Sequence, residues 1–243
     1  MKKFLTLAVL TLGLTLTGCG NSNDATDDST KEATSPKTTF KGEYTVDADY
    51  VKDNLDDIIL IDARGDDAAK KETVKKAVPM AWQYLADVES GASGDENWGL
   101  VLEPKKLAER LGEKGIDKDK EVVLFASAQE GWGDDGRIAW ELLAAGYKDV
   151  KMVDGGFSAL KDAGIKTNKG GTELKPVDVK IDSLNQDHMI KTDELKADYD
   201  DYKIVDVRAN EEYDGEVLYG EAKAIFLEQS KFDTLICSIK MVL

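Results

Sequence analysis

The chain contains few of the residues that build metal sites, disulfide frameworks or nucleophilic centres. Its 243 residues include two cysteines, one histidine and four prolines. The single histidine, His188, cannot form a histidine-based zinc site or, in its polar surroundings, pair with a cysteine for catalysis. The glycine motifs of phosphate-binding loops and dinucleotide sites are also missing. We therefore predict no metal and no cofactor.

Basic residues are outnumbered, with 32 Lys and Arg against 48 Asp and Glu, a formal charge of −16. Residues 1–18 hold Lys2 and Lys3 and no acidic residue, so without them the balance is 30 against 48, or −18. This charge argues against binding to nucleic acid or to an anionic lipid surface. Because the acidic residues are spread along the chain, we interpret them as a solvated surface and not as an acidic tail.

The one strongly apolar run, Phe4 to Leu16, is too short to span a bilayer, which takes about 20 residues. Two lysines precede it and small residues follow, which is typical of a secretory signal; the alternative is a short transmembrane anchor. We predict a signal segment over 1–19. Residues 20–39 are rich in Ser, Thr, Asp, Asn and Lys and are predicted to be a disordered linker.

A β-α-β pattern lies between Glu121 and Leu160. Val122 to Phe125 is an uninterrupted apolar run of the kind that forms a strand buried on both faces. A loop of small residues follows, and Asp134 or Asp135 is predicted to cap a helix that Gly146 ends. A second strand, 150–153, leads into Asp154-Gly155-Gly156. The pattern predicts an α/β fold with a parallel sheet.

The preceding segment supplies the other elements of one domain, predicted over 40–164. The patterns predict strands at 44–46 and 58–62, and helices at 48–54, 66–76 and 104–114. Trp82 and Trp98 lie near a Gly- and Asp-containing excursion, 84–98, and we interpret them as packing residues.

The end of this segment resembles a rhodanese-like (sulfurtransferase) domain. The matching pattern is apolar strand, loop, helix, Gly-Tyr-Lys-Asp-Val, an apolar pair and Asp-Gly-Gly. The resemblance implies that Ala126, followed by Ser127, stands where the family has its catalytic cysteine. It extends to Asp62-x-Arg64, a structural bracket in the family, and to Pro79. The family's substrate is a small sulfur-containing anion, thiosulfate or 3-mercaptopyruvate.

The chain departs from the family at the positions that carry the chemistry. No thiol lies in the loop, and Glu130, Asp134 and Asp135 would repel an anionic sulfur donor. In the family's Gly-His-Ile-Pro-Gly-Ala motif, this chain has Ala77 and Met80 at the histidine and the second glycine. We therefore predict no catalytic residue in this domain.

The pattern restarts after a linker predicted over 165–176. The heptad 202–208 repeats 58–64, and Asp206 and Arg208 repeat the Asp-x-Arg element 144 residues after Asp62. Internal repetition predicts tandem domains, the second over 177–243 with a strand at 177–181 and a helix at 190–198. The family pattern stops after Lys223, and we interpret this as a truncated or frameshifted second copy with an aberrant tail. Cys237 lies in that tail without the loop and helix that activate a thiol.

The ending of the signal segment, Leu16-Thr17-Gly18-Cys19, resembles a bacterial lipobox. The resemblance implies cleavage before Cys19, lipid on its sulfur, and an extracytoplasmic protein anchored to the cell membrane. Three functions stay open: a lipoprotein sulfurtransferase like the intact family, a non-catalytic binding module at the cell envelope, and a defective product. The sulfur donor and acceptor, the protein partners and the oligomeric state are also open.

Overall fold

The computed structural model describes residues 41–93, 95, 97–128, 131–208 and 210–214. The predicted signal segment, the disordered linker, Glu130 and the aberrant tail with Cys237 lie outside the described residues. Among the described residues, no helix is long and apolar enough to cross a membrane. All of them belong to one compact unit, residues 38–243.

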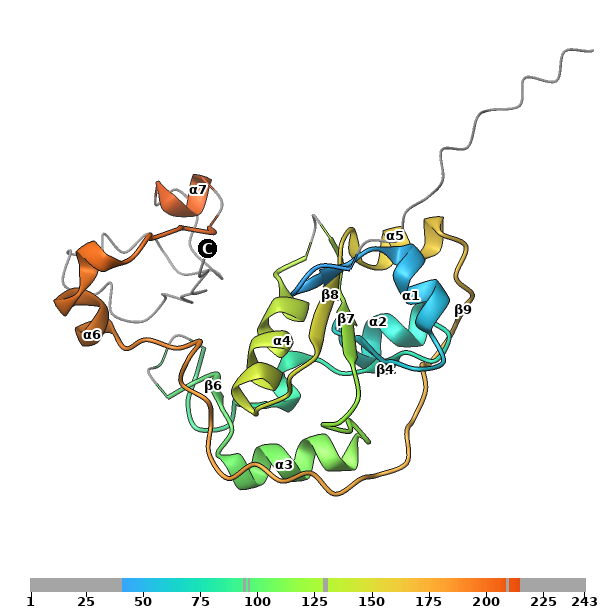
Figure 1. Cartoon of the computed structure of the whole chain (residues 1–243), viewed down its shortest axis with the longest axis horizontal. Helices are drawn as coiled ribbons and strands as arrows, with labels where there is room; N and C mark the ends of the chain where they lie inside the picture. The colour runs from blue at the N-terminus through green and yellow to red at the C-terminus, as the bar shows by residue number, and fades with distance from the viewer. Residues whose placement is uncertain (1–40, 94, 96, 129–130, 209, 215–243) are drawn as a thin grey trace, which may run out of the picture. The chain divides into compact units, whose positions relative to one another are not determined.

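A five-stranded parallel sheet forms the centre of this unit (Figure 1). Its order is β1 (Thr45–Val46), β8 (Val150–Val153), β7 (Val122–Phe125), β2 (Ile59–Asp62) and β4 (Val78–Pro79). The central pair is in register from Ile59 opposite Val122 to Asp62 opposite Phe125. All four neighbouring pairs are parallel, so the predicted α/β fold with a parallel sheet is confirmed.

Alternate residues of the central strands build two separate cores, as expected for a sheet covered on both faces. Ile59, Ile61 and Leu124 face one core, which α3 (Pro104–Glu113) and α4 (Asp134–Ala144) cover. Leu60 and Phe125 face the other, which α1 (Ala48–Asn54) and α5 (Gly156–Asp162) cover. Full burial of each such side chain stabilises the fold by about 1.5–3 kcal/mol.

Short elements complete the unit. α2 (Gly65–Lys71) follows β2, and β3 (Thr73–Val74) pairs antiparallel with β9 (Thr167–Asn168). The excursion after β4 contains η1 (Trp82–Tyr84) and a hairpin of β5 (Ala86–Asp87) and β6 (Leu100–Val101). Beyond residue 190 the described elements are α6 (Thr192–Ala197), η2 (Tyr199–Asp201) and α7 (Asn210–Tyr213).

Two predictions at helix ends are wrong. The helix predicted over 66–76 ends at Lys71, because Glu72 is extended and the β-branched residue Thr73 begins β3. Helix α4 has Gly133 at its N-cap, with a φ of 77°, and no side chain caps it. Asp134 and Asp135 instead lie inside the first turn, where carboxylates are favoured by the helix dipole.

Residues 165–189, which we call the strap, run along the unit and are packed against it (Figure 1). The strap includes the predicted linker, 165–176. Thr172 N–H donates to the carbonyl of Ala77 at 2.8 Å, and Gly171 packs on Pro79. Further along, Ile181 is 8% exposed within the α3–α4 core. The strap therefore adds side chains to the core of the first domain.

The strand predicted over 177–181 is wrong, because these residues lie beside helix α3, whose backbone groups are already paired along the helix. At the last turn of the helix, Val177 N–H donates to Gly112 O at 3.0 Å, and the same carbonyl also accepts from Gly115 N–H. A β-carbon on Gly112 would lie 2.6 Å from Val177 O, and one on Gly115 would lie 2.6 Å from Lys175 O. The absence of both side chains allows the strap to approach α3 closely.

The repeated heptad, 202–208, is not a strand. Residues 203–207 have no regular secondary structure, and no strand of the described part of the chain pairs with them. Val205 and Val207 are 71% and 77% exposed, whereas Leu60 and Ile61 in β2 are buried. The sequence repeat therefore does not produce a repeat of the sheet among the described residues.

Candidate functional site

The loop between β7 and α4, residues 126–133, lies at the carboxyl end of the central strand, where parallel sheets usually place their ligands. Ala126, at the position that the resemblance gives to the catalytic cysteine, is only 1% exposed. Its methyl group is packed in the α3–α4 core, and Ser127 next to it is exposed. The described loop residues that follow the strand, 126–128, thus supply no thiol at the strand end.

The Asp-Gly-Gly turn after β8 lies directly against Ala126. Phe157 N–H donates to the carbonyl of Ala126 at 2.9 Å. A β-carbon on Gly156 would overlap this carbonyl, and Gly155, at a φ of 75°, is the N-cap of α5. The two glycines are therefore required by the close approach of the turn to the loop and by a left-handed backbone.

The carboxylate of Asp135 accepts a hydrogen bond from the backbone N–H of Gly136 at 2.9 Å. Burial raises the pKa of Asp135, and nearby backbone groups, that of Gly136 first and that of Ala126 last, oppose the shift. Burial also raises the pKa of Asp134, with the negative charge of Asp135 as a further cause. An internal carboxylate thus lies beside the loop backbone, where its negative charge would oppose an anionic ligand.

Asp62 and Arg64 form a buried fork at the end of β2. Arg64 Nε donates to Asp62 Oδ1 at 2.8 Å, and Arg64 Nη2 donates to Asp62 Oδ2 at 2.7 Å. Asp62 also accepts from the hydroxyl of Thr73 at 2.6 Å, and its side chain is fully buried. The guanidinium lies 3.7 Å from the ring centroid of Phe157, which is stacked on Phe125 at 5.9 Å.

Among the described residues, the groups that this fork contacts all belong to the fold, and its predicted role as a structural bracket stays a prediction. Arg64 also donates to the carbonyl of Glu72 at 2.9 Å, so one side chain connects β2, the end of α2 and α5. Thr73 and Phe157 were missed as partners in the sequence. Their signals were weak: a threonine eleven residues after the aspartate, and the bulky residue after Asp-Gly-Gly.

The remaining predicted site residues fall in separate places. Pro79 ends the outer strand β4 and packs against Gly171 of the strap, away from the loop contacts of Asp154-Gly155-Gly156. Asp206 and Arg208 pair with each other and are both 37% exposed. Cys19 lies outside the described residues. The roles predicted for these residues stay predictions.

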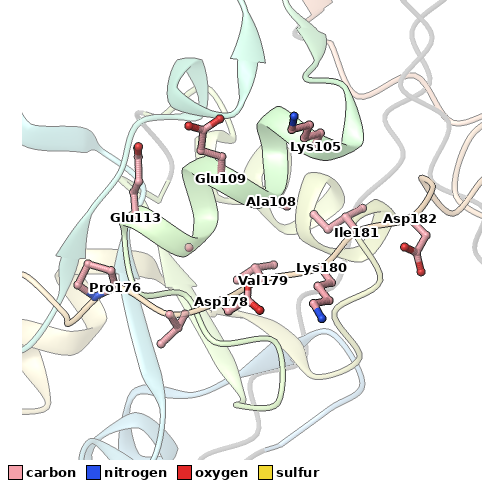
Figure 2. Close-up of a pocket in the computed structure, with 12 residues that line it drawn as sticks. Lys105, Ala108, Glu109, Glu113, Pro176, Asp178, Val179, Lys180, Ile181 and Asp182 are labelled. Carbon is pink, nitrogen blue, oxygen red and sulfur yellow. The ribbon is translucent and has the colours of Figure 1, made fainter.

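Neither described hollow coincides with the loop. An open groove of about 510 Å³ lies between α3 and the strap, where Figure 2 shows Glu109 and Glu113 on the helix opposite Asp178 and Lys180. A second hollow, of about 450 Å³, includes Tyr44 and His188. Within the described ranges, no group of three or more His, Cys, Asp or Glu side chains could hold a metal ion.

Comparisons with known proteins agree with this geometry. Residues 47–163 match the model of the rhodanese-like domain family. A Pseudomonas aeruginosa protein named "Probable 3-mercaptopyruvate sulfurtransferase" is 30% identical over 131 residues, which are 50% of this chain and 45% of that protein. The chain therefore spans about half the length of this curated relative.

Two solved structures share the fold. SseA from Escherichia coli, described with the rhodanese fold of 3-mercaptopyruvate sulfotransferases, is 23% identical with a TM-score of 0.60. The match covers 75% of this chain and 71% of SseA. A 3-mercaptopyruvate sulfurtransferase from Leishmania major is 20% identical with a TM-score of 0.51, over 66% of this chain and 46% of that one. Residues 47–163 thus form a rhodanese-like domain with homology to 3-mercaptopyruvate sulfurtransferases.

Proposed function

We propose that the rhodanese-like domain is a non-catalytic module of a sulfurtransferase-related lipoprotein at the cell envelope. The observation that carries this proposal is the pairing of a buried methyl group, Ala126, with an internal carboxylate, Asp135, at the loop. The first leaves no nucleophile at this position, and the second places a negative charge beside the loop backbone where an anionic substrate would bind.

Sulfur transfer from thiosulfate needs a thiolate that can hold the transferred atom. The thiolate attacks the outer sulfur, the S–S bond of thiosulfate breaks, and sulfite leaves with the electron pair, so that a cysteine persulfide remains. Ala126 has no atom for this bond, and the hydroxyl of Ser127 cannot hold a persulfide. Both cysteines of the chain, Cys19 and Cys237, lie outside the described residues.

The direct experiment compares the purified chain with a Cys237→Ser variant in thiosulfate:cyanide and 3-mercaptopyruvate assays. We expect neither protein to show sulfur transfer above the uncatalysed rate. Activity that the wild-type chain shows and Cys237→Ser loses would overturn the proposal. It would support instead the second candidate, sulfur transfer as in the named relatives, with the cysteine supplied from beyond the described residues.

Restoring the loop tests which feature prevents catalysis. In the Cys237→Ser background, Ala126→Cys alone is expected to give little activity, because the carboxylate of Asp135 still lies beside the backbone of residue 126. Adding Asp135→Asn removes the negative charge and should increase both thiol reactivity and thiosulfate turnover. Equal activity with and without Asp135→Asn would show that this carboxylate does not block the loop.

The location at the cell envelope rests on the lipobox resemblance at Leu16-Thr17-Gly18-Cys19. The wild-type protein should fractionate with membranes and partition into detergent, and Cys19→Ala should accumulate as the uncleaved precursor. Wild-type protein that is found soluble in the cytoplasm, with an unmodified Cys19, would refute this part of the proposal.

A further inference from the structure

Helix α4 carries a buried carboxyl group that the loop does not use. Glu141 is fully buried, and its Oε1 accepts from Arg137 Nε at 3.0 Å. Its Oε2 has no hydrogen-bond partner among the described residues. Burial raises the pKa of Glu141 to about 7, although Arg137 opposes the shift by charge attraction and hydrogen bonding. This group therefore changes its charge near neutral pH and not in the usual acidic range.

Arg137 connects this carboxyl group to a separate element. Its Nη2 donates to the carbonyl of Gly99 at 2.6 Å, and Gly99 N–H donates to Asp87 O, which joins the ends of the β5–β6 hairpin. The guanidinium lies 5.5 Å from the ring centroid of Trp82 and 4.9 Å from that of Trp140. One cation thus holds a hairpin, two indole rings and a titratable acid together.

Other charged groups around α4 do not act on Glu141. Asp134 and Asp135 lie in the first turn of α4, beside the loop. Lys151 of β8 pairs with Asp149, the residue that precedes this strand. η1 carries no charged side chain, and Asp87 of the hairpin binds Ser90. Of the described residues, Arg137 is the one charged partner that influences the ionisation of Glu141.

We propose that Glu141 and Arg137 form a pH-sensitive switch that fixes the β5–β6 hairpin and Trp82 to helix α4 when Glu141 is ionised. The ionised carboxylate orients the guanidinium between the two indole rings and toward Gly99 O. On protonation the charge attraction is lost, so Arg137 is held only by a neutral carbonyl and the ring faces. The hairpin is then attached more weakly on the acidic side of the transition.

Tryptophan fluorescence of the full-length chain tests the switch, in a Trp132→Phe background that removes the exposed indole of the loop. From about pH 5.5 to about pH 8.5, emission should show one transition with a midpoint near 7. Glu141→Gln, which imitates the protonated acid, should keep the low-pH emission throughout. Glu109→Gln, an exposed carboxylate of α3, is the matched control and should leave the transition unchanged.

His188 is the competing source of a transition, because its carbonyl accepts a hydrogen bond from Trp140 Nε1 at 3.1 Å. His188→Asn should retain the transition. A transition that His188→Asn abolishes and Glu141→Gln retains would overturn the proposal, as would constant emission in the parent protein. Should Glu141→Gln not fold, carbon-13 NMR of the glutamate carboxyls in the parent chain decides, and a Glu141 midpoint near 4.5 would overturn it.

Discussion

The two Asp-x-Arg elements of this chain form the same ion pair in different surroundings. In both, the arginine Nε donates to Oδ1 of the aspartate, at 2.8 Å in the first and 2.9 Å in the second. Asp62 is buried under Thr73 and belongs to a strand with neighbours on both sides, whereas Asp206 is 37% exposed and belongs to no strand. The ion pair therefore forms from residues that are close in the sequence, whereas a strand forms only where neighbouring strands pair with it.

The same comparison applies to the apolar residues that precede each pair. Leu60 and Ile61 are buried between two helical layers, and the corresponding Ile204 and Val205 are 45% and 71% exposed. Apolar surface stabilises a strand only when another layer removes it from water. Two nearly equal heptads can thus have very different stability within one molecule.

The largest difference is expected in amide hydrogen exchange. Amides at Leu60 and Ile61 should open only with global unfolding, whereas those at Val205 and Asp206 should exchange from the native state, a contrast of roughly 10³-fold or more. Limited proteolysis should correspondingly trim the chain to a point after the strap, near Met189. Protected amides over 204–207 would contradict the comparison and would mean that residues outside the described set cover this heptad.

Removing each aspartate measures the same contrast in free energy. Asp62→Ala leaves Arg64 without its buried counter-charge and should lower the free energy of unfolding by about 3–5 kcal/mol. Asp206→Ala should change it by less than about 1 kcal/mol, because an exposed ion pair contributes little. Urea denaturation of both variants gives the two values. Equal losses would show that the second element is as well packed as the first.

Alanine substitutions at two glycines distinguish the stability cost of displacing the strap from the cost of a strained backbone. Gly115 and Gly164 have φ values of 72° and 74°, so an alanine at either site costs about 1 kcal/mol for its backbone. Only at Gly115 does the new β-carbon meet the strap, at Leu174 and Lys175, whereas nothing lies within 4 Å at Gly164. Thermal unfolding should show that Gly115→Ala lowers the free energy of unfolding by about 1–2 kcal/mol more than Gly164→Ala does. Equal losses would mean that the strap adjusts freely.

Glu141→Gln is expected to have an effect on stability that depends on pH. Because the folded pKa of Glu141, about 7, exceeds the ordinary 4.5, ionisation costs folding free energy as pH rises from about 4.5 to 7. The variant should be more stable than the parent by on the order of 1–3 kcal/mol at pH 8 and equally stable at pH 4. Denaturation at both pH values measures this, and a stability difference that does not depend on pH would contradict it.

Much of the first domain could be predicted because its elements are strongly patterned. The helix at 48–54 and the strand at 122–125 have the predicted bounds, and Val122 to Phe125 lacks the period that would favour a helix. The strap could not be predicted, because its packing depends on two glycines that are distant from it in the sequence, Gly112 in α3 and Gly115 just after that helix. Propensity alone does not report such contacts.

The sequence identified the residues of the candidate site but did not predict which of them contact one another. Ala126 and Asp135 were recognised from their positions, whereas the proximity of the Asp135 carboxylate to the backbone of Ala126 depends on how the loop joins the helix. Glu141 had a readable signal that was missed: it lies three residues after Ile138 and one before Leu142, on the apolar stripe of α4. An acidic residue at such a position, four residues after an arginine, suggests a buried pair.

The hydrogen bond between Thr172 and Ala77 also bears on self-association. β4 is an outer strand, and an outer strand with unpaired backbone groups is a template for strands of other molecules. Pro79 lacks a donor, and the strap takes the Ala77 acceptor and covers Pro79 with Gly171. A fragment cut at Gly164 would lose this cover and present a bare edge, so it should aggregate during expression. A fragment that continues past Met189 keeps the edge closed and should remain monodisperse at the same concentration.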